Sequence, residues 1–325
     1  MKISQLGEFG LIDRIRKKNI NRTGSSGAVI GIGDDCAVVK CKRGRNLLFT
    51  TDTLIENVHF SKKHFSNFDI GYKSIAINLS DIAAMGGVPL YALITAGFPA
   101  STEVRVADEI LRGIKKLTRE FGVEIIGGDT VKSPTALIIS VALIGRTISG
   151  TGIKRSGAKP GDVIFTTGPF GDSAVGFRLL QRGITGHKGL KQKHLRPYPK
   201  IKDGVFIAKS GFANSMIDSS DGFDKSIRLI CEESGVGCEI RFDKIPVSSE
   251  FKSVSSSLKL PTSDLILFGG EEFELIFTVP FKKKSYFAGN FYEVGRITRG
   301  KDIVYVDKKG KRMNFGNGGY DHFKK

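Results

Sequence analysis

The sequence contains no tryptophan and has only four cysteines and four methionines in 325 residues. Four cysteines are too few for a disulfide-stabilised scaffold of this length. They form no C-x-x-C pair and no zinc-finger spacing, so we expect small buried thiols in a reducing compartment. The ordinary hydrophobic fraction of 40% excludes a disordered or collagen-like chain.

Long hydrophobic runs are also scarce. Residues 82–100 lack any charge, but Gly86, Gly87 and Pro89 interrupt them, so we expect a helix end followed by a strand rather than a membrane helix. Residues 1–10 contain no apolar core of a signal peptide. These features predict a soluble cytoplasmic protein with no membrane contact.

Acidic side chains are in the minority, with 33 Asp and Glu against 50 Lys and Arg, which gives a net charge of +17. This excess favours anionic partners such as nucleic acid, an anionic membrane or phosphorylated small molecules. The densest basic tract, residues 178–202, offers one tyrosine and no regular stripe of charge, so we expect a solvated loop rather than a nucleic-acid surface.

The length predicts about two domains, each of mixed α and β structure. A stretch rich in Gly, Ser, Lys and Pro at 149–161 places the boundary, giving domains 1–148 and 149–325. A hairpin is expected from 37–39 and 47–49, and Ser101 is expected to cap a helix. The other expected elements are helices at 70–85, 104–121, 173–181 and 224–233 and strands at 90–96, 124–126, 136–144, 163–167, 273–279, 292–297 and 303–306.

Several familiar catalytic motifs are missing. The sequence has no G-x-S-x-G, no H-E-x-x-H and no H-R-D loop. Gly31-Ile32-Gly33 begins a dinucleotide fingerprint, but Asp34 and Asp35 follow, and two carboxylates are a poor lining for a bare pyrophosphate. Common hydrolase, zinc-protease and nucleotide-binding folds are therefore disfavoured.

What the sequence does contain is a series of aspartates beside Gly, Ser or Thr. One such aspartate is usually a turn or cap residue, but five recurrences in a basic protein indicate more. Hard oxygen ligands with small neighbours suit Mg²⁺, which is commonly coordinated by protein carboxylates together with phosphates and waters. The series predicts a Mg²⁺-dependent phosphoryl-transfer site, in which positioning and charge neutralisation do most of the catalysis. Its members lie in the segments 31–35, 50–53, 78–81, 127–130 and 218–222.

The ordered set of these motifs resembles the thiamine-monophosphate kinase family, which belongs to a superfamily with aminoimidazole ribonucleotide synthetase and selenophosphate synthetase. The resemblance extends from Gly7 to Phe323. Its most specific pieces are 31–37, 51–60 (TDTLIENVHF), 78–86 (NLSDIAAMG), 127–130, 155–161 (RSGAKPG) and 269–275 (GGEEFEL).

The resemblance implies ATP-dependent phosphorylation of thiamine monophosphate to thiamine diphosphate by direct in-line transfer. It implies several Mg²⁺ ions, with K⁺ as an optional further cation. The implied metal ligands are Asp35, Thr50, Thr51, Asp52, Asp81, Asp129, Asp218 and Asp221. The implied ATP contacts are Gly128, Asp129, Arg155 and Ser220, and the implied contacts to thiamine monophosphate are His59, Glu271 and Tyr320.

The family also implies a PurM-like fold of two α/β domains. Its N-terminal domains pair through their sheets across a homodimer, near the ATP sites. The chain departs from the family pattern at Ser226, where Asp is common, and at Glu272-Phe273, where Asp-Tyr is usual.

Two alternatives stay open at this point. The first is another ATP-dependent PurM-like synthetase or maturation factor with a different substrate. The second is a basic nucleic-acid-binding protein, whose duplex binding would weaken steeply as salt is added.

Overall fold

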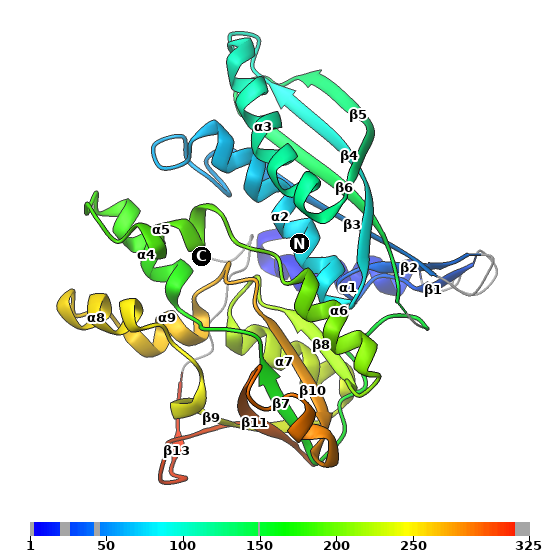
Figure 1. Cartoon of the computed structure of the whole chain (residues 1–325), viewed down its shortest axis with the longest axis vertical. Helices are drawn as coiled ribbons and strands as arrows, with labels where there is room; N and C mark the ends of the chain where they lie inside the picture. Colours follow the sequence, from blue (N-terminus) through cyan, green and yellow to red (C-terminus); the bar gives the residue numbers. More distant parts are fainter. Residues whose placement is uncertain (1–2, 20–26, 42–45, 149, 316–325) are drawn as a thin grey trace.

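Two β-sheets form the frame of the structure, a computed structural model that describes residues 3–19, 27–41, 46–148 and 150–315 (Figure 1). The first sheet has the order β1-β2-β3-β6-β4-β5, and the second has the order β13-β12-β9-β11-β7-β10-β8. The strands of the first sheet are β1 (Ala28–Ile30), β2 (Ala37–Lys40), β3 (Asn46–Ile55), β4 (Val88–Phe98), β5 (Glu124–Lys132) and β6 (Ile138–Arg146). Those of the second are β7 (Asp162–Thr166), β8 (Ser215–Asp218), β9 (Gly237–Arg241), β10 (Leu275–Pro280), β11 (Tyr292–Thr298), β12 (Ile303–Val306) and β13 (Arg312–Met313).

Helices lie on both sheets, so the expected mixed α/β class is confirmed. The hairpin of β2 and β3 is antiparallel as expected, and its turn at 42–45 lies outside the described residues. The domain boundary expected at 149–161 falls between the two sheets and stays a prediction. The helices are α1 (Ile3–Asn19), α2 (Asn67–Ala84), α3 (Val104–Phe121), α4 (Asp172–Gln181), α5 (Lys188–Leu195), α6 (Ile201–Ser210), α7 (Phe223–Ser234), α8 (Ser249–Ser257) and α9 (Thr262–Phe268).

Helix α2 begins with a capping box. The Asp69 N–H donates to Ser66 Oγ (3.2 Å), and the Ser66 N–H donates to Asp69 Oδ2 (3.1 Å), which satisfies two N–H groups at the start of the helix. The helix ends before Gly86, whose φ of 64° lies in the left-handed region. The uncharged run at 82–100 therefore becomes the end of α2 followed by β4, as expected. In the described part of the chain, no helix combines the length and apolarity needed to cross a bilayer.

The expected cap of α3 was wrong. The helix begins at Val104 after Glu103, whose side chain makes no capping bond, and Ser101 lies outside the helix. The end of α3 at Gly122, with φ of 68°, agrees with the expectation. A serine near a helix start is a weak signal when no glutamate or aspartate follows at the third helical position.

Much of the basic tract 178–202 is helical, whereas we expected a solvated loop. It contains the end of α4, all of α5 and the start of α6. The apolar side chains Leu190 and Ile201 pack into the interior, while Lys193 and Lys200 form ion pairs with the buried Glu274. Helices of eight to ten residues have too few turns to give a clear periodic pattern.

Helix α2 lies between the two sheets (Figure 1). One face of β7 and β10, including Phe165 and Phe277, belongs to the same buried core as Ile75 and Leu79 of α2. The other face of the second sheet, including Ile164, packs against α4, α7, α8 and α9 in a separate core. Because strand side chains alternate, the second sheet is buried on both faces. The continuous core fixes α2 against both sheets.

Candidate metal and nucleotide site

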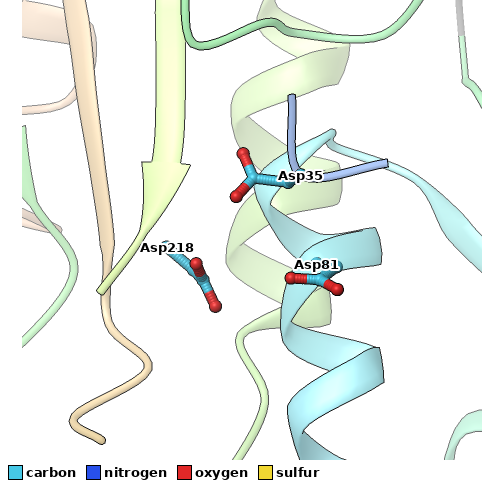
Figure 2. A group of neighbouring side chains, drawn as sticks. All are labelled: Asp35, Asp81 and Asp218. Atoms are coloured by element: carbon cyan, nitrogen blue, oxygen red, sulfur yellow. The ribbon is translucent and has the colours of Figure 1, made fainter. Parts of the chain in front are cut away.

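Three aspartates from distant parts of the sequence lie close together, carried by a loop, a helix and a strand end (Figure 2). Asp35 follows β1, Asp81 lies in the last turn of α2, and Asp218 ends β8. One carboxylate oxygen from each lies within 4.8 Å of the others. Asp35 and Asp218 are buried and Asp81 is half-buried, so the three charges cannot be fully solvated.

Hydroxyl groups and a fourth carboxylate surround this cluster. Thr50 Oγ1 donates to Asp81 Oδ2, and Ser80 Oγ donates to Asp218 Oδ2 (2.6 Å). The Asp52 carboxyl group lies next to Asp81. Thr50 and Asp52 reach the same side of β3 because strand side chains alternate with a period of two. The four aspartates and Thr50 are hereafter called the acid cluster (Asp35, Thr50, Asp52, Asp81 and Asp218).

Burial and mutual repulsion change the acidity of these groups. Burial, followed by repulsion from Asp35, raises the pKa of Asp218 to about 7. Burial raises the pKa of Asp52 to about 6, and it raises the pKa of Asp81 well above its usual range, together with repulsion from Asp52 and Asp218. The pKa of the adjacent Asp34 rises to about 7 for the same two reasons. A site that raises carboxylate pKa values in this way favours a bound cation, which lowers the cost of the negative charges.

One guanidinium already lies in the cluster. Arg155 Nη2 is 2.8 Å from Asp35 Oδ1, and the backbone N–H of Arg155 donates to Asp34 Oδ1 (3.1 Å). Arginine is suited to hold phosphate oxygens through two parallel hydrogen bonds. Its position beside the acid cluster would let it share a phosphate with a metal ion.

The donor set fits a hard divalent cation. Every ligand offered by the acid cluster is an oxygen, which is what Mg²⁺ prefers. Asp35 Oδ2 is buried and has no hydrogen-bond partner among the described residues. An unpartnered buried carboxylate oxygen is costly unless an ion or a ligand contacts it.

The acid cluster opens into a large cavity of about 1790 Å³. Such a volume exceeds that of a typical site for one small molecule, so it can hold two substrates. Besides the acid cluster, it is lined by Thr51, Arg155, Ser220 and Asp221 near the carboxylates and by His59, Phe60, Phe177, His194, Glu271 and Phe273 elsewhere.

Glu271 is fixed in the wall of this cavity. Lys73 Nζ lies 2.6 Å from its Oε1, and His194 Nδ1 lies 3.0 Å from its Oε2. Burial alone would raise the pKa of Glu271, but Lys73 and His194 outweigh it and lower that pKa to about 2. The carboxylate therefore stays ionised at physiological pH.

His59 is held by its backbone neighbour. The Ile55 N–H donates to His59 Nδ1 (3.0 Å), so in the neutral ring Nε2 carries the proton. That proton is a hydrogen-bond donor in the cavity wall, suited to an anionic group of a ligand.

Two implied site residues lie elsewhere, and a third cannot be placed from the described residues. Gly128 and Asp129 are on the edge strand β5 and are not among the described residues that line the cavity. A Cβ on Gly128 would lie 1.8 Å from the Ile94 carbonyl oxygen, and its φ is 154°, so glycine is required for β5 to pair with β4. Tyr320 lies outside the described residues.

Sequence reasoning missed Lys73, His194 and Ser80. Lys73 gave one signal: it is a lone charge in the apolar stretch 70–79, where an amphipathic helix should place its core face. Ser226, a departure from the family pattern, donates to the Asp218 carbonyl oxygen (3.0 Å) and so supports the strand end that carries Asp218.

Comparisons with known proteins identify the relatives of this chain. A family model described as "AIR synthase related protein, N-terminal domain" matches residues 33–147. Thiamine-monophosphate kinase of Aquifex aeolicus is 36% identical over 95% of this chain and 97% of that protein. The enzyme of the same name from Bacillus subtilis is 34% identical over 98% of this chain and all of that protein. The solved structure of AaThiL complexed with AMPPCP and TMP superposes with a TM-score of 0.88 at 34% identity, covering 99% of both chains. This chain therefore belongs to the thiamine-monophosphate kinase family and has its PurM-like fold.

Proposed function

We propose that this chain transfers the γ-phosphoryl group of ATP to thiamine monophosphate, giving thiamine diphosphate and ADP. An oxygen of the substrate phosphate forms the new P–O bond, and the bond between the γ-phosphorus and the β–γ bridging oxygen breaks, so that ADP leaves with the electron pair. The transfer is direct, and no residue of the site forms a covalent intermediate, since positioning and charge neutralisation suffice for phosphoryl transfer. The observation that carries this proposal is one cavity that combines the acid cluster with a fixed carboxylate among aromatic side chains.

Mg²⁺ ions would be held by the acid cluster, with Thr51, Asp129 and Asp221 as further proposed ligands. When bound, they would neutralise the charge of the phosphates and of the carboxylates. Arg155, Ser220, Gly128 and Asp129 are the proposed ATP contacts, with K⁺ as an optional cation. His59, Glu271 and Tyr320 are the proposed contacts to thiamine monophosphate.

The assay that tests this function is product formation by the purified chain. We expect thiamine diphosphate to accumulate in proportion to ADP when ATP, thiamine monophosphate and Mg²⁺ are all present, and to stop when EDTA is added. Separation of the products by chromatography measures both. If no thiamine diphosphate forms over a range of Mg²⁺ and K⁺ concentrations, the substrate assignment is wrong. ATP cleavage without thiamine diphosphate would favour another PurM-like activity.

We also propose that the protein is a homodimer that pairs through the first sheet. Helices α2 and α3 cover one face of this sheet (Figure 1). On the opposite face Phe49, Tyr91 and Leu93 are exposed, and on the edge strand β5 so are Ile126 and Val131. An exposed apolar face beside an unpaired edge strand is typical of a protein interface.

A dimer would have twice the chain mass of 35.4 kDa. Sedimentation equilibrium is expected to give that doubled value, and Leu93→Glu together with Ile126→Glu should reduce it to the single-chain mass. Val104→Glu, at an exposed position of α3, serves as the control and should leave the measured mass at the dimer value. A single-chain mass for the unsubstituted protein would contradict the dimer.

The basic charge does not require nucleic acid. Several cations of the tract 178–202 are engaged within the protein, since Lys193 and Lys200 pair with Glu274, and Arg196 pairs with Asp69. Paired cations contribute less to a phosphate-binding surface than free ones. The absence of a nucleic-acid partner and the cytoplasmic location stay predictions.

A further inference from the structure

Lys73 is the least expected residue of the interior. It lies in the middle of α2 with a side chain that is 0% exposed, and Lys is almost never fully buried unless it is paired. Its Nζ lies 2.6 Å from Glu271 Oε1 and 5.1 Å from the centre of the Phe65 ring. A buried ion pair contributes little net stability, because the desolvation penalty offsets the attraction. This pair therefore calls for an explanation other than stability.

Both the carboxylate and the backbone of Glu271 are held in place by their neighbours. Lys73 contacts one carboxylate oxygen and His194 contacts the other. Its backbone has φ of 64°, a left-handed conformation that is strained for a non-glycine residue. Its N–H donates to the Ser220 carbonyl oxygen (2.6 Å). Strain that the surroundings hold in place commonly marks a functional position.

His194 reaches this carboxylate from helix α5. Its ring stacks on Phe177 of α4, with centroids 4.8 Å apart and an angle of 28° between the ring planes. Ser173 Oγ lies 3.3 Å from the same Nδ1. Burial, and then the positive charge of Lys73, lowers the pKa of His194. A proton on Nδ1 would face Glu271 Oε2, which lies 3.0 Å away.

Glu271 nevertheless remains open to the cavity. Its side chain is 31% exposed and lines the cavity, whereas Lys73 is enclosed and His194 is 8% exposed. Two oxygens provide about four acceptor positions, and Lys73 and His194 each lie against one oxygen. The remaining positions can accept hydrogen bonds from a ligand.

We propose that Lys73 and His194 are positioning residues, which hold Glu271 as a fixed double acceptor for the amino group on the heterocycle of the substrate. Because Lys73 already balances the charge of Glu271, the site selects a hydrogen-bond donor rather than a positive charge. This inference rests on the proposed function, since it names how that substrate is recognised.

Two groups act directly on this carboxylate, Lys73 of α2 and His194 of α5. In the segment before α2, His64 acts on His194, and His59 lines the same cavity. Lys73 contributes most to the lowered pKa of Glu271, and His194 contributes next. Removal of Lys73 therefore removes the permanent cation that keeps Glu271 ionised.

The first test compares Lys73→Met, Glu271→Gln and the double variant. The readout is KM for thiamine monophosphate between about pH 5 and 8, expressed as a ratio to the unsubstituted enzyme so that titration of the substrate cancels. Lys73→Met is expected to raise KM ~10-fold or more and to make this ratio increase as the pH falls, because Glu271 becomes protonated. The double variant should regain thermal stability and show a high KM ratio that no longer depends on pH.

The second test uses His194→Gln and an altered substrate. Its probe is thiamine monophosphate in which oxygen replaces the amino group of the pyrimidine ring. We expect the unsubstituted enzyme to prefer the amino compound by ~10- to 100-fold in kcat/KM and His194→Gln to lose most of that preference. The matched control is His187→Gln, because His187 lies at the start of the same helix and pairs with the exposed Glu250. This control should retain the full preference.

The outcomes separate this inference from the proposed function. Suppose that the unsubstituted protein makes thiamine diphosphate. If the KM ratio of Lys73→Met then does not change with pH, and His194→Gln keeps the preference for the amino compound, the positioning role is wrong. If the unsubstituted protein makes no thiamine diphosphate, the proposed function itself has failed. KM for ATP in the same variants should stay within about twofold of the original value, and a larger change would show general damage to the site rather than loss of positioning.

Discussion

Asp81→Asn is expected to lower the turnover number by about three orders of magnitude or more, while raising the thermal stability of the metal-free protein. Asp81 lies beside Asp35 and Asp218, and it accepts the Thr50 hydrogen bond. Asn keeps the size of the side chain and one oxygen but removes the negative charge. A cation held by the acid cluster would therefore lose a central ligand charge.

The opposite effect on stability has the same origin. Without a cation, Asp81 is repelled by Asp52 and Asp218 in a buried site. At about 4 Å, two like charges repel by several kcal/mol at the effective dielectric constants of protein interiors, so removing one charge relieves the folded state. The Tm measured in EDTA should rise, and the further rise produced by Mg²⁺ should shrink.

Both effects can be measured with one set of proteins. Steady-state assays at saturating ATP and thiamine monophosphate give the turnover number, and thermal denaturation with EDTA or Mg²⁺ gives the two Tm values. Asp108→Asn is the matched control, because Asp108 is an exposed carboxylate on the adjacent helix α3. An Asp81→Asn protein with near-normal turnover would show that the acid cluster does not hold a catalytic cation.

The metal-free protein is expected to lose stability as the pH rises from about 5 to about 8. Burial and repulsion raise the pKa of Asp34 and Asp218 to about 7 and that of Asp52 to about 6. Unfolded aspartates have a pKa near 3.9, so between the two values the folded state binds more protons than the unfolded state. Stability from this source is fully present below about pH 4 and is lost as the pH rises through 6 to 7.

Mg²⁺ should reverse this trend. An ion that binds the ionised carboxylates of the folded state stabilises it in proportion to its affinity, and that affinity is greatest when the protons have left. The gain in Tm from Mg²⁺ is therefore expected to be large at pH 8 and small at pH 5, and binding at pH 6.5 should release protons. Thermal denaturation and calorimetry in two buffers of different ionisation enthalpy measure both quantities. A Mg²⁺ effect that is equal at both pH values would contradict proton-linked binding.

Much of the frame was predictable from local patterns. The apolar stripe of α3 and the glycine after it marked that helix, and the interrupted run at 82–100 marked a helix end and a strand. Short helices such as α5 and α9 were missed, because eight or seven residues show too little periodicity. Their position is set instead by tertiary packing, which residue patterns do not report.

The candidate site was predictable only in its composition. The aspartate motifs indicated a cation site, and the structure brings Asp35, Asp81 and Asp218 together from three separate elements. Their role as ligands stays a prediction, as does that of Asp129, which the described chain places on an edge strand away from the cavity. The contact of Lys73 with Glu271 joins residues almost 200 positions apart, and no local pattern encodes such a pairing.

Helix α2 supports Glu271 through one residue and contributes another to the acid cluster, and this restricts the dimensions of an acceptable substrate. Lys73, which holds Glu271, and Asp81, which belongs to the acid cluster, are eight positions apart in one uninterrupted helix. At about 1.5 Å per residue, their backbones are separated by about 12 Å along the axis. A molecule that contacts both Glu271 and the acid cluster must match a spacing that this helix holds fixed, so extending or shortening the linker between its ring and its phosphate should disfavour it even when both end groups are retained.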